Sequence, residues 1–180
     1  MIFALLYVPV GLAIKLTSPG PILFSPDNPR FFRVGMRGRQ FRIYKFRTML
    51  HNAPAPINYT ADNDPRITKI GKLLRKTKID ELPQLWNVLM GDMSLIGPRP
   101  LSVCEDEEML QTVPLQHLRR VVRPGLTGLG QVTFGTANTP EEHLVRLQSD
   151  LYYVKHRSLA LDIWILAQTL FVCLGLQKRR

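Results

Sequence analysis

Proline and glycine divide this chain into short segments and so limit the elements that it can form. The 180 residues include 14 prolines and 12 glycines, several of which stand close together. Clusters occur at Thr17–Pro21, Ser25–Pro29, Gly35–Gly38 and Gly97–Pro100. Both residue types favour turns, and proline also lacks the N–H that a strand or helix ladder needs. The segments between the first three of these clusters, and the segment after the third, are short. Only short strands are therefore predicted there, at residues 22–24, 31–34 and 41–44.

Longer stretches carry apolar residues at helical spacing. A basic helix is predicted from Ile67 to Lys76, with Ile70, Leu73 and Leu74 on its apolar face. A second helix is predicted from Glu81 to Met90, ending at Gly91. Its apolar residues recur at the i, i+3, i+4, i+7 spacing of a buried face, namely Leu82, Leu85, Trp86 and Leu89.

A further helix is predicted to begin at Thr139–Glu142, where Thr, Pro and Glu form a helix-start signal, and to run to about His156. Its predicted apolar face consists of Leu144, Leu147, Leu151 and Val154. Together these patterns predict the α+β class, mostly helical with a few short strands.

The charge balance favours polyanionic partners. Lys and Arg number 24 against 14 Asp and Glu, a formal net charge of +10. Anionic lipids, phosphorylated substrates and nucleic acids all suit such an excess. Nucleic acid is not predicted as a partner, because no aromatic residues are interleaved in an RNA- or DNA-reading pattern. The two cysteines, Cys104 and Cys173, form no metal-ligand spacing.

Two apolar stretches bear on membrane association. Met1–Ile14 is uncharged but shorter than the roughly 20 residues of a spanning helix, and Pro9 interrupts it. A re-entrant or interfacial segment fits it, and a buried core helix is the alternative. Leu159–Leu176 is also largely apolar and precedes the basic tail Gln177–Arg180. That tail suits anionic headgroups, although a C-terminal core helix with a solvated end fits equally well.

The densest polar cluster surrounds Asp80 and Glu81. Pro83 is tolerated only in the first turn of a helix, so the two carboxylates are predicted at a helix N-terminus. One carboxylate could hold Mg²⁺ while its neighbour attacks phosphorus, with nearby cations neutralising the transferred group. Ordinary helix capping by Asp80, with Glu81 in the first turn, is the competing interpretation.

Two further motifs could bind phosphate. In Gly97–Pro100, prolines on both sides restrict the backbone around Arg99, which suits a guanidinium that binds phosphate with both arms. The alternative is a surface arginine in a proline turn. Arg123 opens the glycine-rich run Arg123–Gln131, whose backbone N–H groups could cradle phosphate or a base. A purely structural loop fits that run equally well.

Taken in order, five motifs resemble one family. They are Lys45–Met49 (KFRTM), Asp80–Leu89 (DELPQLWNVL), Gly91–Ser94 (GDMS), Gly97–Pro100 (GPRP) and Arg123–Gly128 (RPGLTG). They look like the bacterial sugar transferase domain of the monotopic polyprenyl-phosphate phosphoglycosyl transferases. The resemblance extends from about residue 12 to the C-terminus, and five ordered motifs in one short chain make it specific.

The resemblance implies a reaction. Asp80 would attack the sugar-linked phosphate of a UDP-sugar, releasing UMP and forming a phosphosugar–aspartyl intermediate, which polyprenyl (undecaprenyl) phosphate would then attack. Glu81 would hold the catalytic Mg²⁺. The predicted phosphate-binding residues are Arg75, Arg99, Lys45, Arg47 and Arg123. The reaction would be the first membrane step of glycoconjugate, exopolysaccharide or lipopolysaccharide assembly, with the sugar unspecified.

The resemblance also implies a location and a division of the chain. Residues 1–24 would be a membrane-associated, re-entrant segment and residues 25–180 the catalytic domain, with later amphipathic helices on the membrane surface. Membrane lipids are therefore predicted partners, a homodimer is left open, and the site would face the cytoplasm at the bacterial inner membrane.

The N-terminal segment departs from the family pattern. The family's membrane segment bends at a Ser-Pro pair well before the lysine that matches Lys15, whereas here Val8–Pro9 lies too close to it. Either a truncated first half or a shallow insertion is therefore expected. The alternative function is a non-catalytic, basic module that binds the membrane surface.

Overall fold

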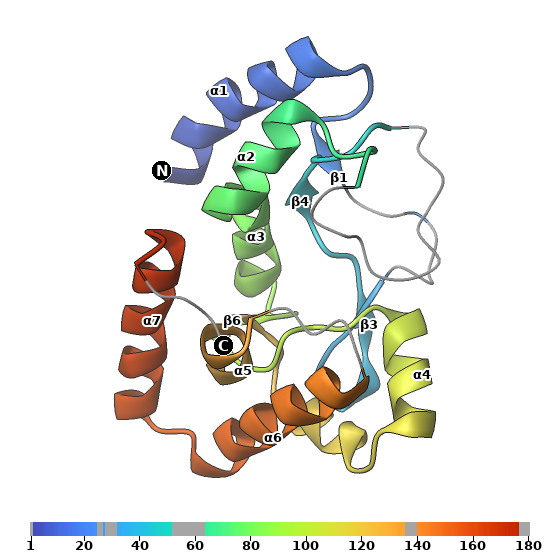
Figure 1. Ribbon diagram of the computed structural model, residues 1–180, viewed down its shortest axis with the longest axis vertical. Helices are drawn as coiled ribbons and strands as arrows, with labels where there is room; N and C mark the ends of the chain where they lie inside the picture. Colours follow the sequence, from blue (N-terminus) through green and yellow to red (C-terminus); the bar gives the residue numbers. More distant parts are fainter. Residues whose placement is uncertain (1, 25–26, 28–31, 52–63, 136–139, 177–180) are drawn as a thin grey trace. The chain divides into compact units, whose positions relative to one another are not determined.

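A computed structural model describes residues 2–24, 27, 32–51, 64–135 and 140–176 (Figure 1). The chain forms two compact units that interleave along the sequence. Unit 1 comprises Met1–Ser25 and Tyr44–Gln84, and unit 2 comprises Pro26–Ile43 and Leu85–Arg180. Among the described residues helices dominate and every strand is two or three residues long, which confirms the predicted class.

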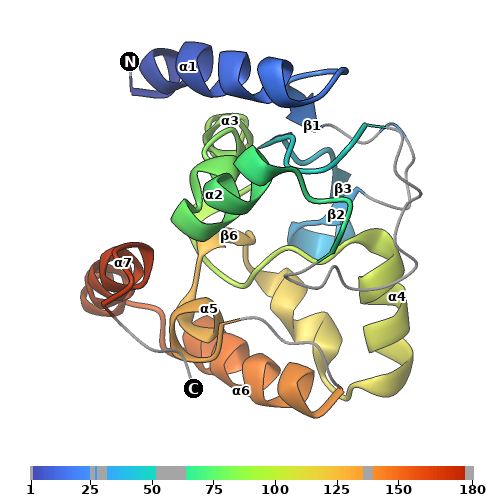
Figure 2. The same cartoon turned by 45° about the horizontal axis from the view of Figure 1, so that its top comes forward.

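In its described part, unit 1 is built from two α-helices and a minimal sheet. Helix α1 (Ile2–Thr17) packs against α2 (Lys69–Thr77), as Figure 2 shows. Strand β1 (Leu23–Phe24) pairs antiparallel with β4 (Lys45–Phe46), so that Leu23 lies opposite Phe46. The 3₁₀ turn η3 (Ile79–Glu81) follows α2 and contacts β4.

The core of unit 1 joins these elements through three buried side chains, Ile14, Phe46 and Leu74. Half-buried apolar residues surround them: Tyr7, Val10, Ile22, Leu23, Ile70 and Ile79. The interruption predicted at Pro9 is not present, because α1 runs through it. Proline there removes one N–H donor from the ladder, and the burial of Ile14 favours the continuous helix.

Helix α2 confirms the basic helix predicted over residues 67–76. Thr68 is its N-cap, and its Oγ1 accepts a hydrogen bond from Gly71 N at 3.0 Å. At Gly71 the helix lies against the backbone of Thr48, where a Cβ would come within 2.0 Å of the Thr48 carbonyl oxygen. Of the predicted apolar face, Leu74 is buried but Leu73 is 55% exposed.

Unit 2 contains the remaining strands in two pairs. Strands β2 (Arg33–Val34) and β3 (Gln40–Phe41) form an antiparallel hairpin around the turn η2 (Met36–Gly38). Strand β5 (Ser94–Ile96) pairs parallel with β6 (Gly125–Thr127). The hairpin agrees with the sequence prediction, whereas β4, β5 and β6 were not predicted.

The helices of unit 2 enclose two apolar clusters. These elements are α3 (Gln84–Leu89), α4 (Val103–Thr112), η4 (Gln116–Val121), α5 (Leu129–Thr133), α6 (Pro140–His156) and α7 (Leu159–Cys173). The first residue of α3, Gln84, is the last residue of unit 1. One cluster is formed by Leu101, Met109, Val113 and Leu147, with Leu151 against it. The other is formed by Val132, Tyr153 and Ile165, with Ile96, Leu129 and Leu161 against it.

Two predicted buried faces are partly wrong. On α3, Trp86 is 54% and Leu89 is 78% exposed, while the polar residue Asn87 is fully buried. Its side chain amide donates to the carbonyl of Arg42 at 2.7 Å, which explains why a polar residue turns inward here. On α6, Leu147 and Leu151 pack into the core, but Leu144 is 42% exposed.

Helix α7 does not match a simple core helix. Only Ile165 is fully buried, whereas Ile163, Trp164, Leu170 and Phe171 are exposed. Within the described ranges, the structure contains no helix with the length and apolar character needed to cross a membrane. The basic tail at residues 177–180, the helix start at Thr139 and most of the Ser25–Pro29 turn lie outside the described residues.

Candidate active site

The Asp80–Glu81 pair lies in η3, immediately after α2. Lys78 ends α2 in the left-handed conformation, with φ of 60°. Glu81 N then donates to Lys78 O at 3.2 Å and Leu82 N to Ile79 O at 3.1 Å. The two carboxylates, predicted at a helix N-terminus, lie in a short 3₁₀ helix and not at the start of the following α-helix. These i→i+3 bonds form a separate 3₁₀ turn, and α3 begins only at Gln84, after Pro83.

Both carboxylates of this pair are largely removed from solvent. Asp80 is 7% exposed and Glu81 is 9% exposed. Lys45, at the start of β4, places its Nζ 3.3 Å from Oε1 of Glu81. Asp80 Oδ1 is buried and accepts no hydrogen bond from the described residues. A buried, unbonded carboxylate oxygen is costly in a purely structural role, which marks Asp80 as a candidate for chemistry.

Burial raises the pKa of Asp80 above its ordinary value. The positive charge of Lys45 opposes this shift, as do those of Lys78 and Arg75, while the negative charge of Glu81 adds to it. The net direction is upward because desolvation of the anion is the largest contribution. The site therefore combines a partly desolvated carboxyl group with three cations whose fields favour its ionised, nucleophilic form.

The other predicted cations of unit 1 differ in their surroundings. Arg75 donates from Nε to Thr48 Oγ1 at 3.0 Å, which fixes the guanidinium near η3. Arg47 instead donates to the carbonyls of Ser18, at 2.7 Å, and Pro19. Its side chain is buried, and this burial lowers its pKa. Arg47 thus ties the turn after α1 to β4, and phosphate binding by Arg47 stays a prediction.

The residues of η3 fit part of a magnesium site. Mg²⁺ prefers oxygen ligands and is commonly held by one or two carboxylates together with substrate phosphates. Asp80 and Glu81 supply adjacent carboxylates, one of them with an unbonded buried oxygen. Among the described residues, no group of three or more His, Cys, Asp or Glu side chains could hold a metal ion. The two adjacent carboxylates are of the ligand type that Mg²⁺ takes from proteins.

Unit 2 contains the Arg99 turn. Gly97 N donates to Thr127 O, and Gly125 N to Pro98 O, each at 2.9 Å, so the turn extends the parallel β5–β6 pairing. A Cβ at Gly125 would lie 2.1 Å from Gly97 N, which explains the glycine at this position. Arg99 is half-buried and Arg123 is exposed. Within the glycine-rich run Arg123–Gln131, Gly125 therefore allows the close pairing of β5 with β6.

Sequence reasoning missed a buried polar group in unit 2. Arg146 and Asp150 in α6 are buried, and half-buried Arg119 in η4 donates to the carbonyl oxygen of Arg99. None of these residues lies in a recognisable motif, and Arg146 and Asp150 are spaced like ordinary solvent-facing charges of a helix. Only the buried fraction distinguishes them, and that follows from tertiary packing.

A buried Asp-Glu pair beside a lysine suits chemistry at a phosphate group. Residues 1–175 match the family described as bacterial sugar transferase, and the chain belongs to that family. This confirms the resemblance inferred from the five motifs.

Three relatives illustrate the similarity. A UDP-N-acetylgalactosamine-undecaprenyl-phosphate N-acetylgalactosaminephosphotransferase of Aeromonas hydrophila is 42% identical over 94% of this chain and 39% of its own length. A UDP-glucose:undecaprenyl-phosphate glucose-1-phosphate transferase of Escherichia coli (strain K12) is 41% identical over 90% of this chain and 34% of its own length. The exopolysaccharide production protein PSS of Rhizobium leguminosarum bv. phaseoli is 42% identical over 89% and 81%, respectively. The chain thus spans little more than a third of the first two relatives.

Proposed function

We propose that this chain transfers a sugar-1-phosphate from a UDP-sugar to polyprenyl phosphate and releases UMP. The observation that carries the proposal is the buried Asp80–Glu81 pair beside Lys45, in a chain similar to enzymes named for this reaction. The relatives named above differ in their sugar, N-acetylgalactosamine in one and glucose in the other, so the proposal names only the UDP-sugar class.

In the first step a carboxylate oxygen of Asp80 attacks the phosphorus that carries the sugar. The bond from this phosphorus to the bridging oxygen breaks, and UMP leaves with that oxygen. In the second step a phosphate oxygen of the polyprenyl phosphate attacks the same phosphorus. The acyl phosphate bond breaks, Asp80 regains its carboxylate, and the sugar becomes linked to the lipid through a diphosphate.

The cations around η3 support the first step. Lys45 and Arg75 stabilise the ionised Asp80 and would offset the charge of an approaching diphosphate. Glu81 would hold Mg²⁺, which would neutralise phosphate charge when bound. In unit 2, Arg99 and Arg123 are proposed to contact substrate phosphate, and Arg47 is retained as a weaker candidate because its guanidinium is engaged by the Ser18–Pro19 turn.

Membrane association is part of the proposal. The acceptor is a lipid, and apolar side chains of α7 are exposed, including Trp164, Leu170 and Phe171. Helix α1 likewise exposes Val8, Leu12 and Leu16. We infer that these helices lie at the cytoplasmic face of the bacterial inner membrane, with residues 1–24 as a membrane-associated segment.

A UMP-release assay tests the proposal. The chain would be incubated with Mg²⁺, undecaprenyl phosphate and a panel of UDP-sugars that includes UDP-glucose and UDP-N-acetylgalactosamine. UMP release that depends on at least one donor supports the function. Vesicle binding that weakens with salt, with no UMP release from any donor, would instead favour the non-catalytic membrane-surface module.

A further inference from the structure

The backbone of the Arg99 turn is held through its carbonyl oxygens. Pro98 and Pro100 have no N–H, so this turn has few donors of its own. Pro98 O accepts from Gly125 N at 2.9 Å, which anchors the side of the turn that continues β5. Arg99 O accepts from Nη2 of Arg119, also at 2.9 Å. The orientation of the Arg99 peptide therefore depends on a side chain from η4.

Arg119 is in turn oriented by Asp150 of α6. Its Nη2 lies 2.8 Å from Oδ2 of Asp150, and the two side chains are 9% and 2% exposed. The same nitrogen atom thus forms an ion pair with the Asp150 carboxylate, without hydrogen-bond geometry to Oδ2, and donates a hydrogen bond to the Arg99 carbonyl. With two partners on one nitrogen and almost no solvent, the guanidinium has little freedom to rotate.

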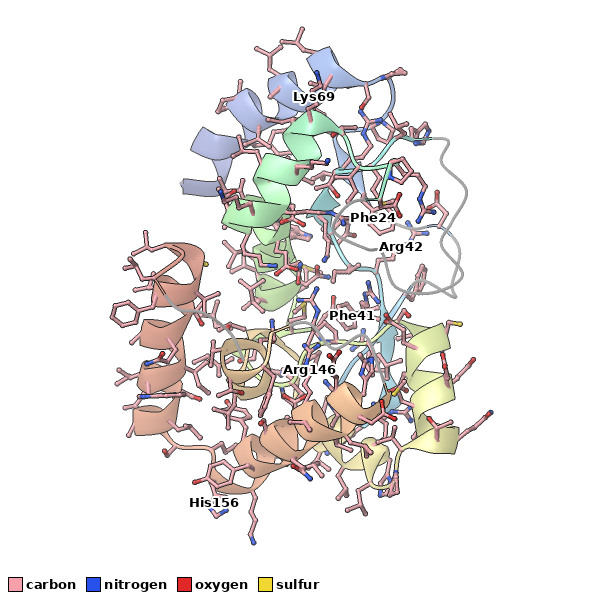
Figure 3. The ribbon with its side chains drawn as sticks, in the orientation of Figure 1. Phe24, Phe41, Arg42, Lys69, Arg146 and His156 are labelled. Carbon is pink, nitrogen blue, oxygen red and sulfur yellow. The ribbon has the colours of Figure 1, made fainter. Side chains whose placement is uncertain are left out.

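The surrounding charges require the carboxylate of Asp150. Arg146 lies on α6 (Figure 3), and its side chain approaches Gly130 of α5. The pKa of Arg146 is lowered to about 10, mainly by burial; the charge of Asp150 opposes this shift, and the charges of Arg99 and Arg119 add to it. Arg146 is still a cation at neutral pH, and the negative charges of Asp150 and Glu105 both favour that state.

A buried ion pair of this kind is seldom a strong source of stability. Desolvation of both ions offsets most of their attraction, and well-packed apolar replacements are often equally stable. The pair is, however, well suited to fixing direction, because it holds one hydrogen-bond donor at a defined place. That donor is Nη2 of Arg119, and it donates to the carbonyl oxygen of Arg99, the residue between the two prolines.

We propose that Arg119 and Asp150 are positioning residues that aim the Arg99 side chain at phosphate. This rests on the proposed function, in which Arg99 binds a phosphate group of the substrate. Asp150 orients Arg119, Arg119 holds the Arg99 carbonyl, and the flanking prolines transmit that position to the Arg99 Cα. Two-armed binding of phosphate needs the guanidinium plane aligned, and a misplacement of about 1 Å can cost on the order of a hundredfold in rate.

The test uses the full chain and the variants Arg119→Gln, Asp150→Asn, Arg99→Ala and the double variant Arg99→Ala/Arg119→Gln. Arg120→Gln is the matched control, since Arg120 is the next residue of η4 but pairs with Asp106. Two quantities would be measured: the affinity for inorganic pyrophosphate by calorimetry, and kcat and KM for UMP release. Thermal unfolding would report whether each variant is folded.

Arg119→Gln and Asp150→Asn are expected to weaken pyrophosphate binding roughly tenfold and to raise KM for the UDP-sugar, whereas Arg120→Gln changes both less than about twofold. In the Arg99→Ala background, Arg119→Gln should have almost no further effect, because it acts through Arg99. If Arg119→Gln does not fold, Arg119→Lys, which keeps a charge and a donor, should give a smaller loss with the same dependence on Arg99.

Several results would overturn the inference: unchanged pyrophosphate affinity in Arg119→Gln, a loss that adds fully to that of Arg99→Ala, an equal loss in Arg120→Gln, or a wild type that does not bind pyrophosphate. The proposed function fails separately. If the wild type released no UMP but the binding losses followed the pattern above, Arg119 and Asp150 would still position Arg99, and only the reaction would need revision.

Discussion

The Nζ atom of Lys45 lies 3.3 Å from Oε1 of Glu81, and the two side chains are 18% and 12% exposed. This pair joins the first residue of β4 to the last residue of η3 within unit 1, across 36 positions of sequence. It brings the KFRTM and DELPQLW motifs together and places a cation where it also acts on Asp80.

Lys45→Met is expected to move the acid limb of the pH–rate profile to higher pH. Asp80, the proposed nucleophile, must be ionised to attack, and the Lys45 charge lowers the pKa of Asp80 against the larger effect of burial. Without that charge the pKa of Asp80 rises further, so more alkaline conditions are needed for activity. The pH dependence of kcat/KM for UMP release would measure this, because it reports groups of the free enzyme. An acid limb that stays in place would contradict the assignment.

Asp80→Asn is expected to reduce UMP release by at least about a thousandfold, since the amide cannot form the acyl phosphate. The same variant should be more stable than the wild type at neutral pH. Burial raises the pKa of Asp80, so its ionised form disfavours folding, and this cost grows as pH rises from the unfolded-state pKa to the folded-state pKa.

Urea unfolding at pH 7 would separate this prediction from the capping interpretation. If Asp80 acted only as a helix cap, its replacement would leave stability unchanged or lower it, by about 1 kcal/mol when the cap is lost entirely. Loss of activity together with a gain in stability is therefore the signature of a functional carboxylate in this turn. Glu81→Gln is the companion variant, expected to weaken the Mg²⁺ dependence of turnover while Asp80 is retained.

Leu74→Ala is expected to destabilise the protein by about 2–5 kcal/mol, because Leu74 is buried against Ile14 and Phe46. Leu73→Ala is the matched control on the same helix turn, and it should change stability by less than about 0.5 kcal/mol because Leu73 is mostly exposed. Chemical unfolding of both variants would provide the comparison. Equal losses would show that both leucines are covered in solution.

Replacement of Leu170 and Phe171 by glutamine is expected to weaken binding to anionic phospholipid vesicles by roughly tenfold or more, because apolar burial at the interface contributes about 0.8 kcal/mol per CH₂. Both residues are exposed on α7. Leu110→Gln on α4, also an exposed leucine of unit 2, is the control. Vesicle sedimentation would compare them, and a similar loss in the control would argue against a specific role of α7.

Part of the fold and of the site could be predicted from the sequence. The class, the basic helix now seen as α2, the end of α3 near Gly91 and the hairpin around Gly35–Gly38 all followed from local rules. Glycine and proline restrict the backbone wherever they occur, so such predictions need no knowledge of the rest of the chain. The Asp80–Glu81 pair was also found as a candidate, by its residue types and by the motifs around it.

Burial and long-range pairing were decided only by the tertiary structure. Apolar spacing identifies a helix face, but it does not reveal what covers that face, and so Trp86 and Leu89 are exposed while Asn87 is buried. The parallel pairing of β5 with β6 and the bond from Arg119 to the Arg99 carbonyl join residues far apart in sequence. By itself the sequence determined where the backbone turns and which side chains are candidates for chemistry. Packing decided which of those side chains lose solvent, and the loss of solvent sets their charge state and orientation.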